Sequence, residues 1–263
     1  MIPAIILLLI YAAAAALVLR SMADRRLGPV AAVLAVVAIF VHSEAIVRMM
    51  HVAGPFSIGL LEAISMLGWT LAILAILISF EKHNRVLAAI LLLCAGAGSL
   101  ATSTSHSYAE ATAPGWELTA HILLSMGAAA LLFAAAVTAV LGVVLDRRLR
   151  SRRIADLPRS LPPLDELEKV MFRLIGTGLI LLTLALFTGF VFVHDLFAQH
   201  LAHKTILSLT AWTLFAVLLV GRVRYGWRGR VALYSTLAGF LILALAYFGS
   251  KFVLEYLLGR HWG

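Results

Sequence analysis

Residues 117–153 read ELTAHILLSMGAAALLFAAAVTAVLGVVLDRRLRSRR. From Leu118 to Leu145 the stretch contains no Asp, Glu, Lys or Arg, and five arginines follow within the next eight residues. About 20 apolar residues are enough for a helix to cross the hydrocarbon core of a bilayer. Arginines directly after such a run are typical of a cytoplasmic helix end. The stretch therefore predicts a membrane-spanning helix with one histidine, His121, near the end opposite the arginines.

Seven similar runs occupy most of the remaining chain. Hydrophobic residues make up 62% of the 263 residues and the mean hydropathy is +1.01, whereas soluble domains are about 45–50% apolar. The sequence therefore predicts an all-α, polytopic integral membrane bundle of about eight transmembrane helices, forming a single transmembrane domain over residues 1–263. The predicted spans are roughly residues 3–21, 28–50, 57–80, 86–103, 117–145, 169–196, 204–221 and 231–256.

The basic residues predict the orientation of the bundle. Seventeen of the 21 Lys and Arg residues lie in or beside the first, third, fifth and seventh connections between spans. The positive-inside rule places these connections in the cytoplasm, so both termini are expected outside. The longest polar stretch, about residues 146–168, is predicted to be a basic cytoplasmic loop that attracts anionic lipid headgroups. The net charge of +8 is thereby explained by membrane topology, and no nucleic-acid partner is predicted.

The histidines are distributed unevenly between the two sides. Imidazole is costly to place near hydrocarbon, and it binds metal ions and haem iron. The layer therefore predicts a binding site near the outer face. Only His83 falls on the cytoplasmic side, and the eight histidines near the outer ends of the spans are His42, His51, His106, His121, His194, His200, His203 and His261.

Three of these histidines are the best candidates for a site. With a rise of 1.5 Å per residue, His42, His121 and His194 lie within about 10 Å of one another in depth, so three helices could present imidazoles to one pocket. Exposure to water is the competing interpretation, and it is favoured for the histidines in loops. For His194, a hydrogen-bond network with the adjacent Asp195 at the helix end is an equal alternative.

Charged residues on the same side extend the candidate site. Glu44 and Arg48 are four residues apart, so they can pair on one helix face. Arg48 could instead bind a carboxylate or a haem propionate with two hydrogen bonds. Glu62, near the start of the third span, could bridge to Arg48 or contact a ligand.

The residue types favour haem over other ligands. Haem iron needs one or two axial imidazoles from facing helices, and His42, His121 and His194 are the candidate ligands. The chain contains no GxSxG, P-loop or HExxH motif, so no enzyme is predicted. Two other functions stay open at this point: a transporter or permease for a metal ion or small solute, and a structural subunit of a membrane complex.

Several motifs resemble those of the cytochrome c assembly family, and in particular the YpjD-type branch of its CcsA-like proteins. The resemblance spans most of the chain. Its motifs are VHSEAIVR (Val41–Arg48), LLEAISMLGW (Leu60–Trp69), PGWELTAHILLSM (Pro114–Met126), LFTGFVFVHDLF (Leu186–Phe197), YGWRGR (Tyr225–Arg230) and AYFGSKFV (Ala246–Val253).

The resemblance implies a multi-pass protein of the bacterial inner membrane that binds haem and works with other cytochrome c assembly proteins in cytochrome c maturation. His121 matches the family's external histidine. The tryptophan-rich WxWDxKE loop of typical members is absent, because residues 198–212 read AQHLAHKTILSLTAW and only Lys204 and Thr205 echo it. Whether the haem is b-type or transient, and whether the protein oligomerises, stays open.

Overall fold

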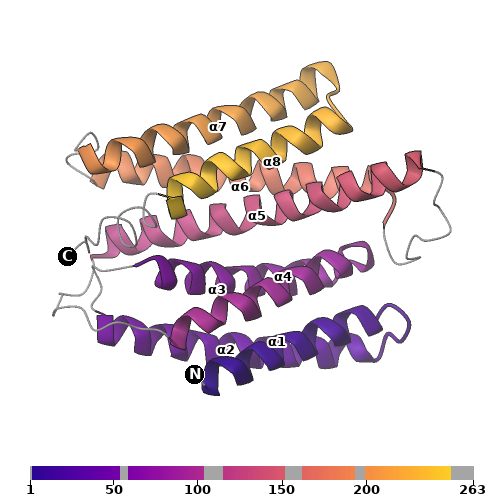
Figure 1. Cartoon of the computed structure of the whole chain (residues 1–263), viewed down its shortest axis with the longest axis vertical. Coiled ribbons are helices and arrows are strands. Elements are labelled where there is room, and N and C mark those ends of the chain that lie inside the picture. Colours follow the sequence, from indigo (N-terminus) through magenta and orange to yellow (C-terminus); the bar gives the residue numbers. More distant parts are fainter. Residues whose placement is uncertain (1, 54–58, 104–114, 152–161, 193–198, 250–263) are drawn as a thin grey trace. The chain divides into compact units, whose positions relative to one another are not determined.

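The computed structural model describes residues 2–53, 59–103, 115–151, 162–192 and 199–249. All regular secondary structure in these ranges is helical, and eight helical segments are long and apolar enough to cross a membrane. This confirms the predicted class and number of helices (Figure 1). The α-helices are α1 (Ile2–Arg20), α2 (Leu27–Ala53), α3 (Leu60–Ser79), α4 (Arg85–Ser99), α5 (Trp116–Arg150), α6 (Leu164–Phe192), α7 (Gln199–Tyr225) and α8 (Arg230–Ala244).

Three short helical segments extend these elements. The 3-10 turns η1 (Lys82–Asn84) and η2 (Leu100–Ser103) flank α4, and the π-helical segment η4 (Leu245–Gly249) continues α8. Together with their neighbours they lengthen the fourth and eighth segments to 22 and 20 residues, enough to span the hydrocarbon core.

The predicted cytoplasmic loop is shorter than expected, because helix continues into it from both sides. Its first residues belong to α5, where Arg150 donates a 3.0 Å hydrogen bond to Asp146 one turn earlier. Its last residues belong to α6, whose start has Pro163 just before it and Asp165 in its first turn. Both are favourable signals for a helix N-terminus. Hydropathy alone misses such polar turns, because they lie outside the hydrocarbon region.

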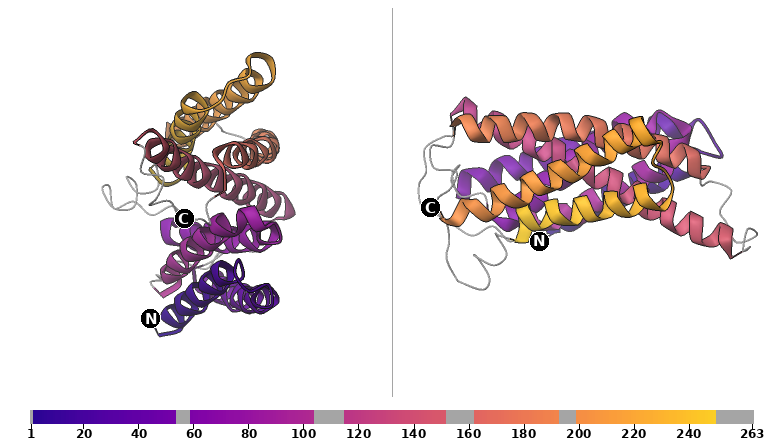
Figure 2. Two further views of the ribbon diagram at one scale, coloured as in Figure 1. Left: turned by 90° about the vertical axis from the view of Figure 1, so that its right-hand side faces the viewer. Right: turned by 90° about the horizontal axis from the view of Figure 1, so that it is seen from above.

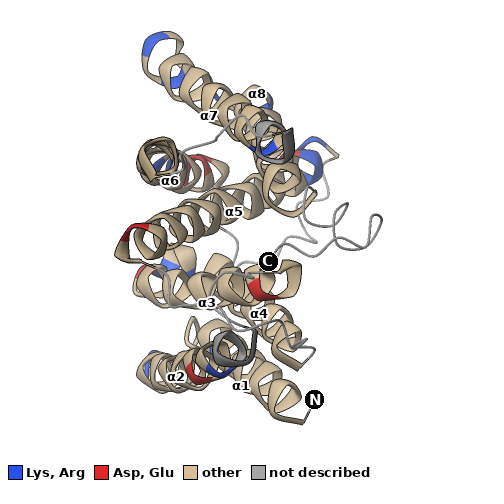
Figure 3. Cartoon of the chain, turned by 90° about the vertical axis from the view of Figure 1, so that its left-hand side faces the viewer, with Lys and Arg blue, Asp and Glu red and all other residues tan. Residues whose placement is uncertain are grey.

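The surface of the helices is apolar along most of its length. Large hydrophobic side chains such as Phe40, Phe80 and Val223 are 71%, 73% and 82% exposed. Charged residues gather towards the helix ends, as Figure 3 shows. Exposed apolar surface on this scale is unusual for a soluble monomer and suits contact with lipid chains.

The contacts among the helices divide the chain into two compact units. In the first unit, α1 packs against α2 and α4, and α3 packs against α2 and α4. Neighbouring helices run side by side in alternating directions (Figure 2). At the α3–α4 contact, a Cβ atom on Gly68 would lie 3.1 Å from the Ala95 carbonyl oxygen, and one on Gly98 would lie 3.0 Å from that of Ile64. Two glycines thus let these backbones approach closely, as is common in membranes.

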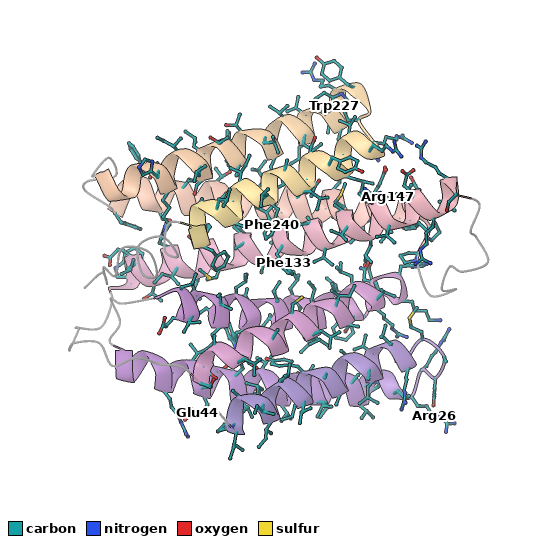
Figure 4. The ribbon with its side chains drawn as sticks, viewed as in Figure 1. Arg26, Glu44, Phe133, Arg147, Trp227 and Phe240 are labelled. Atoms are coloured by element: carbon teal, nitrogen blue, oxygen red, sulfur yellow. The ribbon has the colours of Figure 1, made fainter. Side chains whose placement is uncertain are left out.

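In the second unit, α5 lies against α6 and α8, and α7 lies against α6 and α8. Alanines make up much of the buried face of α5, and Ala134, Ala135 and Ala139 are completely buried. Phe133 of α5 meets Phe240 of α8 edge to face, with ring centroids 5.5 Å apart (Figure 4). Small residues on α5 allow close helix packing, and the aromatic pair fills the wider gap.

The turn between α7 and α8 contains the GWRG motif, and contacts made by the residues of the motif stabilise the turn. The indole of Trp227 lies on Gly221, where a Cβ would clash with the ring, and the Trp227 amide donates to the Gly221 carbonyl. Gly226 and Gly229 have positive φ angles of 67° and 61°, which glycine adopts at no steric cost. The buried carboxylate of Glu168 on α6 accepts a 2.6 Å hydrogen bond from the Gly229 amide. The motif therefore has a structural role in this unit.

Candidate functional site

His121 is the central residue of the candidate site in the second unit. It lies in the second turn of α5, half-buried, and faces the last turns of α6. Its Nδ1 is 3.1 Å from Oγ1 of Thr188, and its Nε2 is 3.5 Å from Oγ of Ser125. The second distance is at the outer limit of a hydrogen bond, so Thr188 is the stronger partner.

The contacts of Thr188 are compatible with a proton on Nδ1 of His121. The Thr188 hydroxyl has one hydrogen, and it donates that hydrogen to the Ala185 carbonyl at 3.0 Å. With that hydrogen on Ala185, the hydroxyl oxygen can accept from Nδ1–H of His121. Neutral His121 then has an unprotonated Nε2. An imidazole whose other nitrogen donates to a neighbour is the arrangement usual for metal ligation.

Gly189 provides the space for this ring. A Cβ at position 189 would lie 3.0 Å from Cε1 of His121 and 3.6 Å from its Nδ1. Any side chain there would press on the imidazole. The sequence TG at residues 188–189 thus supplies both a hydrogen-bond acceptor and clearance for the ring.

Two further helices add polar groups to the site. Tyr247, at the end of the α8 segment, lies close to Ser125 of α5. The ammonium of Lys204, in the second turn of α7, lies 5.5 Å from the centre of the Tyr247 ring. Lys204 is half-buried and lies within electrostatic range of His121. The site therefore combines an imidazole, two hydroxyl groups besides that of Thr188, and one cation.

His42 lies in the first unit and has a different environment. It is 0% exposed, with its Nδ1 3.2 Å from the Tyr11 hydroxyl of α1 and its Nε2 3.0 Å from Oγ of Ser65 on α3. Both ring nitrogens are therefore occupied. In the next position along α2, Ser43 accepts a 2.8 Å hydrogen bond from Nε1–H of Trp69. His42 and Ser43 thus connect three helices through polar contacts, which stabilise the unit whether or not a ligand binds.

Of the ion pairs predicted in the first unit, the structure contains the one between Glu44 and Arg48. Nε of Arg48 donates to Glu44 at 2.8 Å, which confirms the predicted pairing along α2, and 78% of the Arg48 side chain is exposed. Glu62 is 7% exposed in the first turn of α3, where the helix dipole favours a carboxylate. Among the described residues, Arg48 makes no ion pair with Glu62.

The three predicted histidines do not all lie in one described unit. His42 belongs to the first unit and His121 to the second, and His194 lies outside the described residues. The pocket that they were predicted to share stays a prediction. Within the described ranges, no three His, Cys, Asp or Glu side chains gather in the manner of a metal-ion site.

Several residues of the two environments were not predicted as site residues. They are Tyr11, Ser65, Ser125, Thr188 and Tyr247. Residues with a hydroxyl group are common in apolar helices, so residue type alone does not identify these five as site residues. Some were recoverable from helix geometry: Ser125 is four residues after His121 and therefore on the same face.

Comparisons with known proteins find several relatives that are similar over part of the chain. The chain is 40% identical over 158 residues to inner membrane protein YpjD of Escherichia coli K12, covering 59% of each chain. It is 39% identical over 149 residues to an uncharacterised 28.8 kDa protein of Azospirillum brasilense, covering 56% of this chain and 55% of that one. It is also 30% identical over 112 residues to cytochrome c biogenesis protein CcsA of Rippkaea orientalis, covering 40% of this chain and 33% of CcsA.

These matches each extend over part of the relative's length. No solved structure matches the chain. The family model for "Cytochrome C assembly protein" matches residues 57–258, a region that contains His121, Thr188, Lys204 and the GWRG turn. With eight apolar helices of spanning length, the chain belongs to the cytochrome c assembly protein family.

Proposed function

We propose that this protein binds haem near the outer face of the bacterial inner membrane and takes part in cytochrome c maturation. The family and the CcsA relative, which is named as a cytochrome c biogenesis protein, support the process. YpjD, named as an inner membrane protein, supports the location. In this proposal the protein holds or presents haem, works with other assembly proteins and catalyses no reaction itself.

The observation that best supports haem binding is the set of hydrogen-bond partners around the two ring nitrogens of His121. A haem ligand needs an unprotonated imidazole nitrogen. In the tautomer whose Nδ1–H donates to Thr188, Nε2 of His121 meets that requirement, and its only described hydrogen-bond contact is the weak one with Ser125. The donor set thus fits one axial ligand, and haem would supply the iron centre.

Of the other predicted haem-binding residues, His42 and Arg48 would have to give up existing hydrogen bonds to bind haem. Iron binding by His42 would require loss of its hydrogen bond to Tyr11 or to Ser65. Arg48 would have to exchange its exposed contact with Glu44 for a propionate, which costs little for a surface pair. His194 completes the proposed set. We rank His121 first, and His42, His194 and Arg48 after it.

The proposed orientation follows from the positive-inside rule. The α7–α8 turn and the end of α5 bear Arg222, Arg224, Arg147 and Arg150, so we place this end of the second unit in the cytoplasm. His121, at the opposite end of α5, is then near the outer face, and both termini are outside.

An absorption spectrum of the purified protein tests the proposal. We expect a Soret band in detergent, either on isolation or after addition of haem. His121→Ala removes the proposed ligand atom Nε2, so it should shift the band and weaken haem binding by at least about tenfold. The matched control is His83→Ala, because His83 is exposed in the η1 turn at the predicted cytoplasmic side.

A wild-type protein that shows no Soret band after haem addition would contradict the proposal. So would a His121→Ala variant that binds haem as His83→Ala does. Stabilisation by a metal ion or small solute in the absence of haem would favour a transporter instead.

A further inference from the structure

Lys204 is a cation in the first turn of a membrane-spanning segment, and it has no counter-ion among the described residues. It lies in the segment His203–Tyr225. Among the described residues, no carboxylate is within ion-pair distance of its ammonium, and its one described contact is with the face of the Tyr247 ring at 5.5 Å. Ionisable residues in such segments normally pair with another group or serve a ligand.

Lys169, in the same unit, shows the usual arrangement. Its ammonium is 2.8 Å from Asp165 and 2.9 Å from Glu166, both on α6. That lysine is at the opposite end of the unit from His121. The chain therefore offers one lysine whose charge is compensated and one whose charge faces an aromatic ring.

The position of Lys204 connects it to His121. Tyr247, under the ammonium, lies close to Ser125, and Ser125 is 3.5 Å from Nε2 of His121. Two side chains, Tyr247 and Ser125, thus lie between the Lys204 ammonium and Nε2 of His121. A ligand that meets Nε2 would have its periphery near Lys204.

From these contacts we propose that Lys204 binds a carboxylate at the edge of the ligand that His121 coordinates. This inference rests on the proposed haem binding, and it assigns to Lys204 a porphyrin propionate as its counter-ion. The aromatic face of Tyr247 holds the ammonium in place until the carboxylate arrives. Haem binding then supplies the negative charge that the described residues of the site lack.

The experiment compares two porphyrins that differ only in this charge. Wild-type protein and the variant Lys204→Met are titrated with haem and with haem dimethyl ester, whose propionates are neutral. We expect Lys204→Met to weaken haem binding by about tenfold or more, because a hydrogen bond between charged groups is lost. Binding of the ester should be the same in both proteins. Lys204→Arg should keep most of the preference for the free acid.

Two controls separate this inference from the proposed function. Lys169→Met should leave both titrations unchanged, because Lys169 already has two carboxylate partners. His121→Ala should weaken haem and its ester alike. Without ligand, Lys204→Met should unfold at the same temperature as wild type or higher, because an uncompensated cation is removed.

Equal weakening of haem and ester by Lys204→Met would overturn the role of Lys204 and leave haem binding by His121 intact. A ligand-free Lys204→Met protein that unfolds several degrees below wild type would also overturn it, in favour of a structural role. Failure of wild type to bind either porphyrin would overturn both proposals.

Discussion

His121 and His42 show how neighbouring hydroxyl groups decide what an imidazole can do. Both were predicted from the sequence, since histidine stands out in an apolar helix. Their partners were not, because Thr188 and Tyr11 lie 67 and 31 residues away along the chain, and such pairings depend on how helices cross. The structure adds a distinction that the sequence could not make: both nitrogens of His42 have close hydroxyl partners, whereas Nε2 of His121 has only a 3.5 Å contact with Ser125.

At the residue scale, Gly189→Ala should disturb His121 without altering its chemistry. The new Cβ would lie 3.0 Å from Cε1 of the ring, so the imidazole must shift by a few tenths of an ångström. We expect haem affinity to fall by several-fold and stability to fall by about 1–3 kcal/mol. Haem titration and thermal unfolding in detergent would measure both.

Gly176→Ala is the matched control, because it lies on the same helix with nothing within 4 Å of its Cβ position. Replacing glycine by alanine in a helix should stabilise the protein there by about 0.5–1 kcal/mol. Identical behaviour of the two variants would show that Gly189 does not position His121.

At the element scale, the helices were predicted closely and their polar ends were not. Apolar runs identify the hydrocarbon-spanning parts of α5 and α6. Arg150 and Asp165 lie in helical turns outside those parts, and ion pairs stabilise these turns. The GWRG motif was read from the sequence only as a family resemblance. Its physical basis became visible with Trp227 on Gly221 and Glu168 under Gly229.

Glu168→Ala should loosen the α7–α8 turn. The Gly229 amide would lose its 2.6 Å partner, and we expect a loss of about 1–3 kcal/mol in the free energy of unfolding. Glu168→Gln keeps an acceptor oxygen, so its loss should be smaller. Unfolding in detergent, monitored by circular dichroism, would rank the variants by their free energy of unfolding.

Glu166→Ala serves as the comparison for that series. Glu166 is on the same helix, and its described ion pair is the exposed one with Lys169, so a change of less than about 1 kcal/mol is expected. If Glu168→Ala were no more damaging than Glu166→Ala, the turn would not depend on this carboxylate.

At the scale of the whole molecule, composition and charge distribution predicted an eight-helix membrane protein, and the structure agrees. The division of the helices into α1–α4 and α5–α8 was not predicted, because hydropathy identifies spans and not their neighbours. The predicted orientation can be tested with single cysteines. In a Cys94→Ala background, Ile2→Cys and Ser151→Cys place a thiol at the N-terminus and just after α5.

Both chosen positions are exposed. If the termini are outside, a membrane-impermeant maleimide added to cells with a permeabilised outer membrane should label the Ile2→Cys protein. It should reach the Ser151→Cys protein only after the inner membrane is opened. The reverse pattern would show that the bundle is inserted the other way round.

The contact of Gly68 with Gly98 has a consequence for the evolution of the chain. Each position faces backbone of the opposite helix, so a larger residue at one cannot be offset by a smaller residue at the other. Mutations there cannot be rescued in pairs, as they can between side chains. We therefore expect these two sites to tolerate almost no drift among descendants of this chain, while Gly176, with open space around it, varies freely.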